Sequence, residues 1–335
     1  MSRIIIGIHG LGNKPPREIL TVWWLKSMQE GLQRMGYKNI YFPFELVYWA
    51  DVFHKHPLDV QEKNPESPFY LESPYVPSSD FIPPRIGKIR QRILNFLEKE
   101  MKKFFSNTDY SNTLDLVSDW LIRRYFNDLN LYFRSAENID EETQLSAREI
   151  IHQRLLTTLK KHQNKDILLI AHSMGSIIAY EVLSLYEKEC QIDTLVTIGS
   201  PLGQPLIFSK FYKKLARKEF QGAHLHVPEN IRNHWYNLAD LRDFVAMNHQ
   251  LSENFLENSR HLEIVDKIVT NDYYYQNIHN PHKVYGYLRT SEMSQIIYEF
   301  LSHDRSKFGF WLSNRLQKFK QKYFVPAEGD SSTQR

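Results

Sequence analysis

The segment from Ile167 to Tyr186 constrains the fold more than any other part of the sequence. It begins with the apolar run Ile167–Ala171, passes through His172–Gly175 and continues as a helix-forming stretch. A buried strand that turns directly into a helix presents the residue at the turn above the edge of a sheet. That residue is Ser173, so we expect its hydroxyl to stand at the end of a buried strand. A serine that only caps a helix is the alternative, but a cap requires no preceding strand.

Strands and helices alternate through most of the chain. We expect strands at 4–8, 46–51, 167–171, 194–198, 235–239 and 262–269, and helices at 17–35, 143–161, 174–187 and 291–302. Such alternation is typical of a parallel sheet covered by helices. The predicted fold class is therefore α/β, with a mostly parallel central sheet flanked by helices.

Residues 52–140 interrupt this alternation and are predicted to be an insertion. Seven of the 15 prolines lie between 57 and 84, which disfavours regular structure there. Apolar residues then recur on one face over about 86–104 and again over about 114–132, which predicts two amphipathic helices. These helices would form either a cap or ordinary packing helices outside the sheet, and periodicity does not decide between the two.

The rest of the chain divides into a core and a C-terminal extension. The predicted core comprises 1–51 and 141–302, and the last stretch, 326–335, is expected to be a loose tail. Within the basic amphipathic segment 303–325, residues 303–324 set aromatic and aliphatic side chains among six lysines or arginines and one aspartate. This composition fits a segment docked on its own domain, and it also fits peripheral contact with an anionic membrane.

Charge and composition exclude several classes of protein. The chain has 42 basic and 39 acidic residues, a net charge of +3 that does not indicate a nucleic-acid partner. Its single cysteine, Cys190, permits neither an internal disulfide nor a cysteine-rich metal site. The sequence has no apolar run near 20 residues and no N-terminal signal pattern, so a cytoplasmic location is the default expectation, with membrane association or signal-independent export left open.

The turn around Ser173 resembles the nucleophile elbow of α/β-hydrolases. The usual first glycine of that motif is Ala171 here, a departure also found among small bacterial lipases. The resemblance implies an α/β-hydrolase fold with a nucleophile at Ser173. The early turn His9–Gly12 resembles the family's His-Gly oxyanion loop, which implies oxyanion donors at the backbone N–H groups of Leu11 and Met174.

A serine nucleophile needs a carboxylate to orient its base. In this family the acid follows the serine, and the segment 235–245 reads as a strand running into a turn with two aspartates, Asp240 and Asp243. Both are eligible on position. The resemblance favours Asp243, because the related pattern ends with an aspartate, one variable residue and a valine, and Asp240 is the reserve.

The base is expected on a loop after the last strand. The segment 277–288 offers His279 and His282 there. The resemblance favours His282, because related hydrolases place this histidine shortly before an aromatic segment that leads into the final helix. His279 is the competing candidate.

The residues expected beside the substrate flank these turns. They are His9, Gly10, His172, Pro201 and Leu202. Ser200 is rejected as a nucleophile, because Pro201 lacks the following backbone N–H that an oxyanion hole would use.

These features predict a serine hydrolase that cleaves esters of lipid or other hydrophobic acyl groups through an acyl-enzyme on Ser173. An acyltransferase, a thioesterase or an amidase would use the same triad, and a catalytically silent hydrolase-fold scaffold remains a further alternative. The expected partner is a small-molecule or lipid ester, with no cofactor, no metal and no nucleic acid. The sequence does not predict the oligomeric state.

Overall fold

Six parallel strands form the central sheet of the protein. The computed structural model describes residues 2–37, 40–78, 132, 145–204, 225–246 and 248–302. The strands are β1 (Arg3–Ile8), β2 (Phe44–Val47), β3 (Asp166–His172), β4 (Ile192–Ile198), β6 (Ile231–Asp240) and β8 (Ile264–Val269). They lie in the order β2-β1-β3-β4-β6-β8, and every neighbouring pair is parallel. The predicted α/β class with a parallel central sheet is confirmed.

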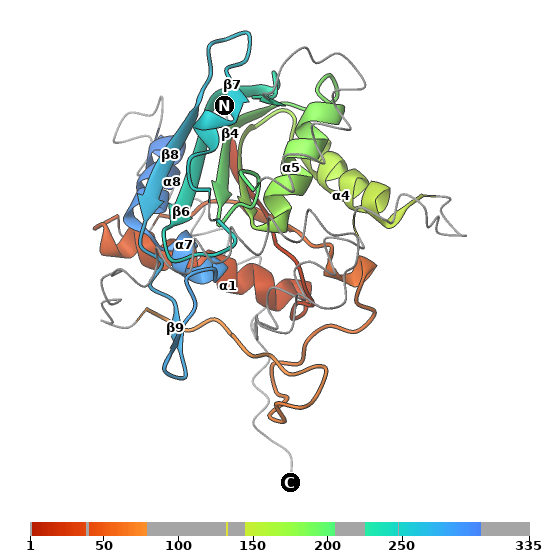
Figure 1. Ribbon diagram of the computed structural model, residues 1–335, viewed down its shortest axis with the longest axis vertical. Coiled ribbons are helices and arrows are strands. Elements are labelled where there is room, and N and C mark those ends of the chain that lie inside the picture. The colour runs from red at the N-terminus through yellow and green to blue at the C-terminus, as the bar shows by residue number, and fades with distance from the viewer. Residues whose placement is uncertain are drawn as a thin grey trace, which may run out of the picture.

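Helices cover both faces of this sheet (Figure 1). One face is covered by α4 (Ala147–Lys161) and α5 (Met174–Leu185), and the other by α1 (Arg17–Arg34), α7 (Val284–Leu288) and α8 (Ser291–Ser302). Ile4 and Ile6 of β1 pack toward α4 and α5, whereas Ile5 packs toward α1 and α8. Because both faces are buried, these strands are apolar throughout rather than alternating.

The ends of some elements differ from the sequence expectation for local reasons. β2 ends at Val47, before the 3₁₀ turn η1 (Ala50–Val52), because Trp49 is tied by two hydrogen bonds to His9 beyond the end of β1. β6 begins four residues earlier than expected, at Ile231, because the polar residues 232–234 hide its start. α4 begins after Ser146, whose side chain forms a reciprocal capping box with Glu149.

Several short elements carry no periodic signal that a sequence could show. β5 (Leu225–His226) pairs with β7 (Phe255–Leu256), next to the 3₁₀ turn η3 (Leu251–Glu253). β9 (Tyr274–Tyr275) and β10 (Ile278–His279) form an antiparallel hairpin. Its two turn residues, Gln276 and Asn277, have φ values of 48° and 61°, as a two-residue type I′ turn requires.

Much of the predicted insertion lies outside the described residues. The described part, 53–78, consists of turns and extended chain with one isolated bridge between Asp59 and Tyr70. The expected helices at 86–104 and 114–132 fall outside it apart from Tyr132, and the segment 303–335 falls outside it entirely. Among the helices that the structure describes, none combines the length and apolar character needed to cross a bilayer.

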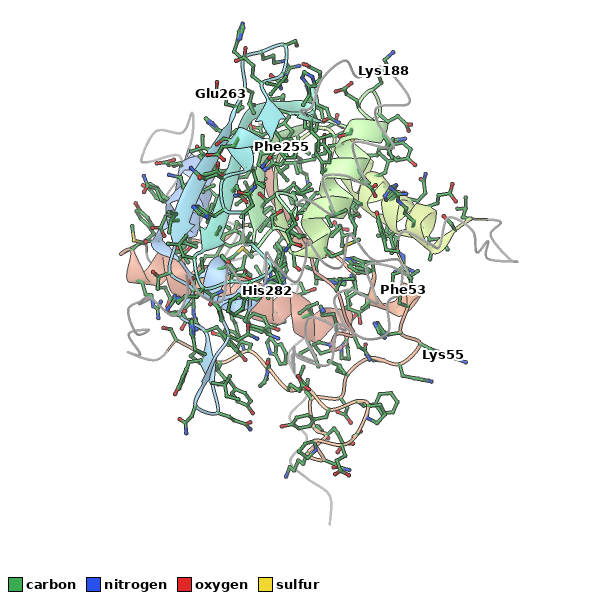
Figure 2. The ribbon with its side chains drawn as sticks, in the orientation of Figure 1. Phe53, Lys55, Lys188, Phe255, Glu263 and His282 are labelled. Carbon is green, nitrogen blue, oxygen red and sulfur yellow. The ribbon has the colours of Figure 1, made fainter. Side chains whose placement is uncertain are left out.

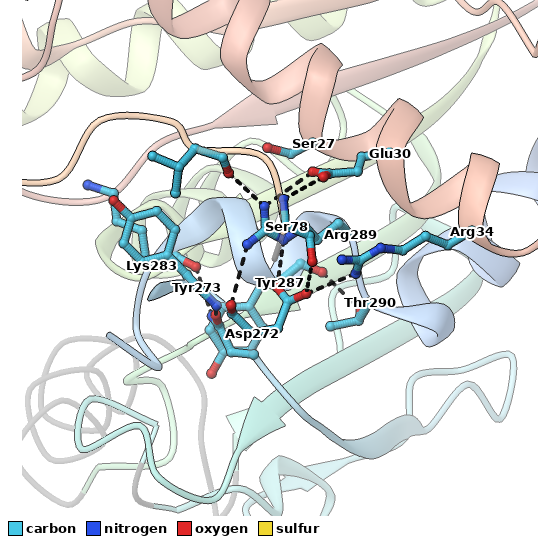
Figure 3. A network of polar contacts seen from close by, with 12 residues as sticks. Ser27, Glu30, Arg34, Ser78, Asp272, Tyr273, Lys283, Tyr287, Arg289 and Thr290 are labelled. Carbon is cyan, nitrogen blue, oxygen red and sulfur yellow. Dashed lines mark hydrogen bonds and ion pairs between the residues drawn. The ribbon is translucent and has the colours of Figure 1, made fainter. Parts of the chain in front are cut away.

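A buried guanidinium ties the described segment 53–78 to the helices (Figure 3). Arg289, only 2% exposed, follows α7 and pairs with Glu30 of α1 and with Asp272, which lies just beyond β8. It also donates to the carbonyl of Val76 at 2.8 Å. The Ser78 hydroxyl reaches the same Asp272 carboxylate at 2.8 Å. The network therefore fixes both ends of the chain segment that lies between β8 and α8.

We expect Arg289→Leu to destabilise the protein by about 3 kcal/mol, because the largely buried carboxylate of Glu30 loses its ion-pair partner and that of Asp272 keeps only the more exposed Arg34. Arg34→Leu is the matched control. Arg34 pairs with Asp272 as well, but its side chain is 43% exposed. We therefore expect a loss of at most about 1 kcal/mol for the control. Urea unfolding measures both, and equal losses would contradict the assignment.

The destabilisation by Arg289→Leu should also depend on pH. Burial alone would raise the pKa of Asp272, but Arg289 and hydrogen bonds from Arg34, Arg289 and Ser78 outweigh it, so the pKa is lowered. A lowered carboxyl pKa contributes stability above the unfolded value, and that stability is lost as pH falls through the folded value. The difference between wild type and variant should therefore shrink below about pH 4. A difference that is constant from pH 7 to pH 3 would contradict this prediction.

Candidate active site

The candidate residues gather at the carboxyl edge of the sheet. The parallel register pairs Ile8 with Ala171, His172 with Ile198, and Asp240 with Val269. The loops that follow β1, β3, β4, β6 and β8 therefore leave the sheet side by side. His282 lies at this edge, from which the β9–β10 hairpin projects, whereas Phe255 and Glu263 lie toward the opposite end (Figure 2). This is the edge at which open α/β sheets bind their ligands.

Ser173 sits in a sharp turn between β3 and α5. Its backbone has φ 55° and ψ −124°, a conformation that residues with a side chain rarely adopt. Its N–H donates to the Ile198 carbonyl at 3.0 Å, and its side chain makes no capping hydrogen bond to α5. The turn is tightly packed, because a methyl group added at Gly10 would lie 2.7 Å from the Ser173 Cβ. The backbone thus aims the hydroxyl away from the helix that follows it.

Ser173, His282 and Asp243 form a continuous chain of hydrogen bonds. The Ser173 Oγ lies 3.0 Å from Nε2 of His282, and Nδ1 of the same ring lies 2.8 Å from Oδ2 of Asp243. The carboxylate is buried, and its Oδ1 accepts a hydrogen bond from the Val245 N–H at 2.9 Å. An ionised carboxylate can only accept, so Nδ1 carries the proton and Nε2 presents a lone pair to the hydroxyl. This is the arrangement in which an imidazole can remove a proton from serine.

The two reserve residues are engaged elsewhere. Asp240 accepts from the Arg242 N–H and Nε at 2.8 Å each and from the Asn271 N–H at 2.6 Å. His279 bonds through Nε2 to the Asn271 carbonyl at 2.8 Å. Burial lowers the pKa of His279, and the hydrogen bond to Asn271 opposes this only in part. The structure therefore brings Asp243 and His282 to Ser173 and holds Asp240 and His279 in a neighbouring backbone network.

The two histidines beside the turns are neutral supports. His9 stacks on Trp49 with ring centroids 4.8 Å apart, and its Nε2 accepts the Trp49 backbone N–H at 3.0 Å. The Nε2 of His172 donates to the His282 carbonyl at 2.9 Å. Burial lowers the pKa of both rings well below the usual value, and the charges of Lys14 on His9 and of His282 on His172 lower it further. Both side chains therefore hold backbone in place at neutral pH.

The backbone N–H groups expected to bind an oxyanion belong to Met174, which follows Ser173, and to Leu11, which follows Gly10. Met174 is the first residue of α5, where backbone N–H groups have no partner within the helix. Leu11 follows Gly10, which packs against Ser173. The Lys14 ammonium donates to the carbonyls of both Leu11 and Gly12, the latter at 3.0 Å. With its carbonyls held by this cation, the loop has a fixed shape.

The turn after β4 is buried beside the serine. Pro201 and Leu202 are both buried, and Leu202 belongs to the apolar cluster beneath α4 and α5. The Ser200 hydroxyl bonds to Ser176 of α5 at 2.8 Å and accepts the Leu202 N–H at 3.2 Å. The Ser200 hydroxyl is therefore hydrogen-bonded to α5 and to its own turn. The chain that follows, 205–224, lies outside the described residues.

Two residues that support the acid escaped the sequence analysis as functional candidates. Gly199 has φ 54°, and a methyl group there would lie 2.9 Å from Oδ2 of Asp243 and 3.2 Å from Nδ1 of His282. Tyr287 donates its hydroxyl hydrogen to Oδ2 of Asp243 at 2.8 Å. Tyr287 lies in the segment 277–288 and Gly199 directly follows the predicted strand 194–198, but only the folded geometry shows that they meet at one carboxylate oxygen.

No metal centre forms among the residues that the structure describes, since no cluster of three or more potential ligands occurs there. A separate open cavity of about 360 Å³ lies between the end of α1 and the start of α8. Its lining includes Arg34, Asp272 and Arg289, and both arginines pair with the one aspartate. It is lined by none of Ser173, Asp243 and His282.

The strained backbone at Ser173 predicts that Ser173→Gly has a higher free energy of unfolding than Ser173→Ala. Ser173→Ala and Ser173→Gly both remove the hydroxyl, but only glycine accepts the positive φ without strain. Relief of about 1–3 kcal/mol outweighs the entropy cost of glycine, about 0.5–1 kcal/mol, so the glycine variant should be the more stable by about 1 kcal/mol. Urea unfolding of the two variants checks this. An alanine variant as stable as the glycine variant would show that the turn is not strained.

Comparison with known proteins agrees with this geometry. Residues 131–276 match the family described as PGAP1-like alpha/beta domain, a span that includes Ser173 and Asp243 and ends shortly before His282. No curated protein matches the chain. The parallel sheet, the turn at Ser173 and the family match agree with one another. The family match over 131–276 and the six-stranded parallel sheet together give the chain the fold of the α/β-hydrolase superfamily.

Proposed function

We propose that the protein is a serine hydrolase that cleaves carboxylic esters of hydrophobic acyl groups through an acyl-enzyme on Ser173. The observation that carries the proposal is the pair of hydrogen bonds through His282, 3.0 Å to the serine hydroxyl and 2.8 Å to Asp243. A hydroxyl, an imidazole and a buried carboxylate in this order are the parts that nucleophilic acyl transfer requires.

In the first half-reaction, Ser173 Oγ attacks the ester carbonyl carbon while Nε2 of His282 takes its proton. The resulting imidazolium is stabilised by the carboxylate of Asp243. Negative charge develops on the carbonyl oxygen, and the N–H groups of Leu11 and Met174 are the donors assigned to it. Collapse of the tetrahedral intermediate breaks the ester C–O bond, and the imidazolium gives its proton to the departing alcohol.

In the second half-reaction, His282 removes a proton from water, which attacks the acyl-enzyme carbonyl. The same two N–H groups face the second oxyanion. Collapse returns the proton to Ser173 Oγ and releases the carboxylic acid, which restores the starting hydrogen bonds. Asp243 remains ionised throughout, because its task is to fix the imidazole tautomer and to balance its charge.

Exposed apolar side chains at this edge support a hydrophobic substrate. Phe244, directly after Asp243, is 40% exposed, and Ile278 on the β9–β10 hairpin is 68% exposed. Burying such surface against an acyl chain is favourable in proportion to the area removed from water. A hydrophobic acyl group would therefore gain binding energy on the same side of the sheet as Ser173.

Ser173→Ala should lower ester hydrolysis by at least about 10³-fold while the protein remains folded, because the variant lacks the oxygen that forms the acyl-enzyme. Initial rates with a p-nitrophenyl ester measure this. Ser27→Ala is the matched control, since it removes a buried serine hydroxyl that bonds to the Trp23 carbonyl within α1. The control should keep its rate per folded molecule. Full activity in Ser173→Ala would refute the nucleophile assignment.

Replacing the apolar side chains at this edge should weaken the preference for long-chain over short-chain esters. We expect Phe244→Ser and Ile278→Ser each to lower kcat/KM for a long-chain ester relative to a short-chain ester, by about threefold. Val265→Ser is the control. Val265 is 43% exposed but lies near the amino end of β8. An unchanged ratio in both edge variants would remove the support for a hydrophobic acyl group.

A further inference from the structure

Tyr287 is a fully buried tyrosine that forms a hydrogen bond with Asp243, the acid of the proposed triad. It lies on α7, five residues after His282, and its side chain is 0% exposed. Its hydroxyl donates to Oδ2 of Asp243 at 2.8 Å and accepts the Asp240 N–H at 3.0 Å. A single phenol oxygen therefore contacts both ends of the turn that runs from Asp240 to Asp243.

The acceptor of this hydrogen bond is the same oxygen that orients the base. Oδ2 of Asp243 receives Nδ1 of His282 as well as the Tyr287 hydroxyl, both at 2.8 Å, while Oδ1 receives the Val245 N–H. Three donors from three chain segments thus hold one buried carboxylate. Gly199 leaves the room that this convergence needs, because a methyl group there would lie 3.1 Å from the Tyr287 ring and 2.9 Å from Oδ2.

The phenol is a permanent donor in this place. Burial raises the pKa of Tyr287 well above its usual value, and the negative charge of Asp243 raises it further. The hydroxyl therefore keeps its hydrogen at neutral pH. Because its acceptor is charged, the bond is worth more than one between neutral groups.

We propose that Tyr287 is a positioning residue for the reaction: it holds the Asp243 carboxylate in the orientation that aligns His282, and it moderates the negative charge that this carboxylate presents to the imidazole. The inference rests on the proposed serine-hydrolase function. The Tyr287 hydroxyl bonds to Asp243 and to the Asp240 N–H and not to Ser173 or His282, so its effect on the reaction passes through Asp243.

This role predicts the direction in which the basicity of His282 changes when the phenol hydrogen bond is lost. Without the phenol hydrogen bond, the charge on Oδ2 is less dispersed and favours the imidazolium more strongly. The apparent pKa of the base in the pH profile of kcat/KM should therefore rise in Tyr287→Phe. The other groups near His282 are unchanged. Ser173 and His172 contact it, and Lys283, whose pKa is lowered to about 8 by burial, follows it in the chain, whereas the charge of Lys14 acts on His172.

The experiment compares Tyr287→Phe with Tyr273→Phe in the full-length chain. Tyr273 is a buried tyrosine that donates its hydroxyl to the Pro74 carbonyl at 2.7 Å, so its variant loses a similar hydrogen bond away from Asp243. For Tyr287→Phe we expect kcat to fall roughly tenfold with KM unchanged, and the acid limb of the kcat/KM profile to move to higher pH. For Tyr273→Phe we expect wild-type rates per folded molecule and a wild-type profile.

Equal behaviour of the two variants in rate and pH profile would overturn the inference and leave Tyr287 a structural residue. Inactivity of wild type, or activity in Ser173→Ala, would instead refute the proposed function, so the two failures are distinguishable. If Tyr287→Phe does not fold, fluorotyrosine at position 287 keeps the packing and strengthens the donor. It should then move the acid limb to lower pH, and an unmoved limb would overturn the inference.

Discussion

The common direction of the six strands is the constraint on which the site depends. Because neighbouring strands are parallel and in register, the loops after β1, β3, β4, β6 and β8 all begin at one edge of the sheet. Residues 70 and then 39 positions apart in the chain, from 173 to 243 to 282, can therefore meet within hydrogen-bond distance. Packing of helices on both faces of the sheet stabilises this register. The same packing offsets the free-energy cost of the strained backbone at Ser173.

Hydrogen-bond donors surround the buried carboxylate of Asp243 and offset the free-energy cost of burying its charge. Asp243 is 2% exposed, a setting in which a charge without hydrogen-bond partners is costly to bury. The imidazole, the phenol of Tyr287 and the Val245 N–H occupy its lone pairs. Neighbouring charges are paired separately, as in the contact between Asp240 and Arg242. Two buried aspartates close together in one turn thus have distinct partners.

The fold could be predicted from the sequence because the strongest signals for it are local. The apolar runs at 4–8 and 167–171 and the turn at Ser173 are patterns of adjacent residues, and each formed the expected element. The choice between two aspartates and between two histidines was different. Spacing placed all four at one edge, and the family resemblance favoured Asp243 and His282. In the folded chain these two bond to each other and to Ser173, whereas Asp240 bonds to Arg242 and His279 bonds to Asn271. The support by Tyr287 and Gly199 depends on three segments meeting at one oxygen, which no local pattern can show.

The most direct test of the account is labelling with a fluorophosphonate probe, which reacts with activated serines, followed by peptide mass spectrometry. For the folded wild-type protein, the account predicts a single adduct on Ser173, and it predicts that His282→Ala and Asp243→Asn, which leave the hydroxyl in place, label far more slowly. A folded protein that does not react, or an adduct on another serine such as Ser200, would contradict the claim that this hydrogen-bonded chain activates Ser173.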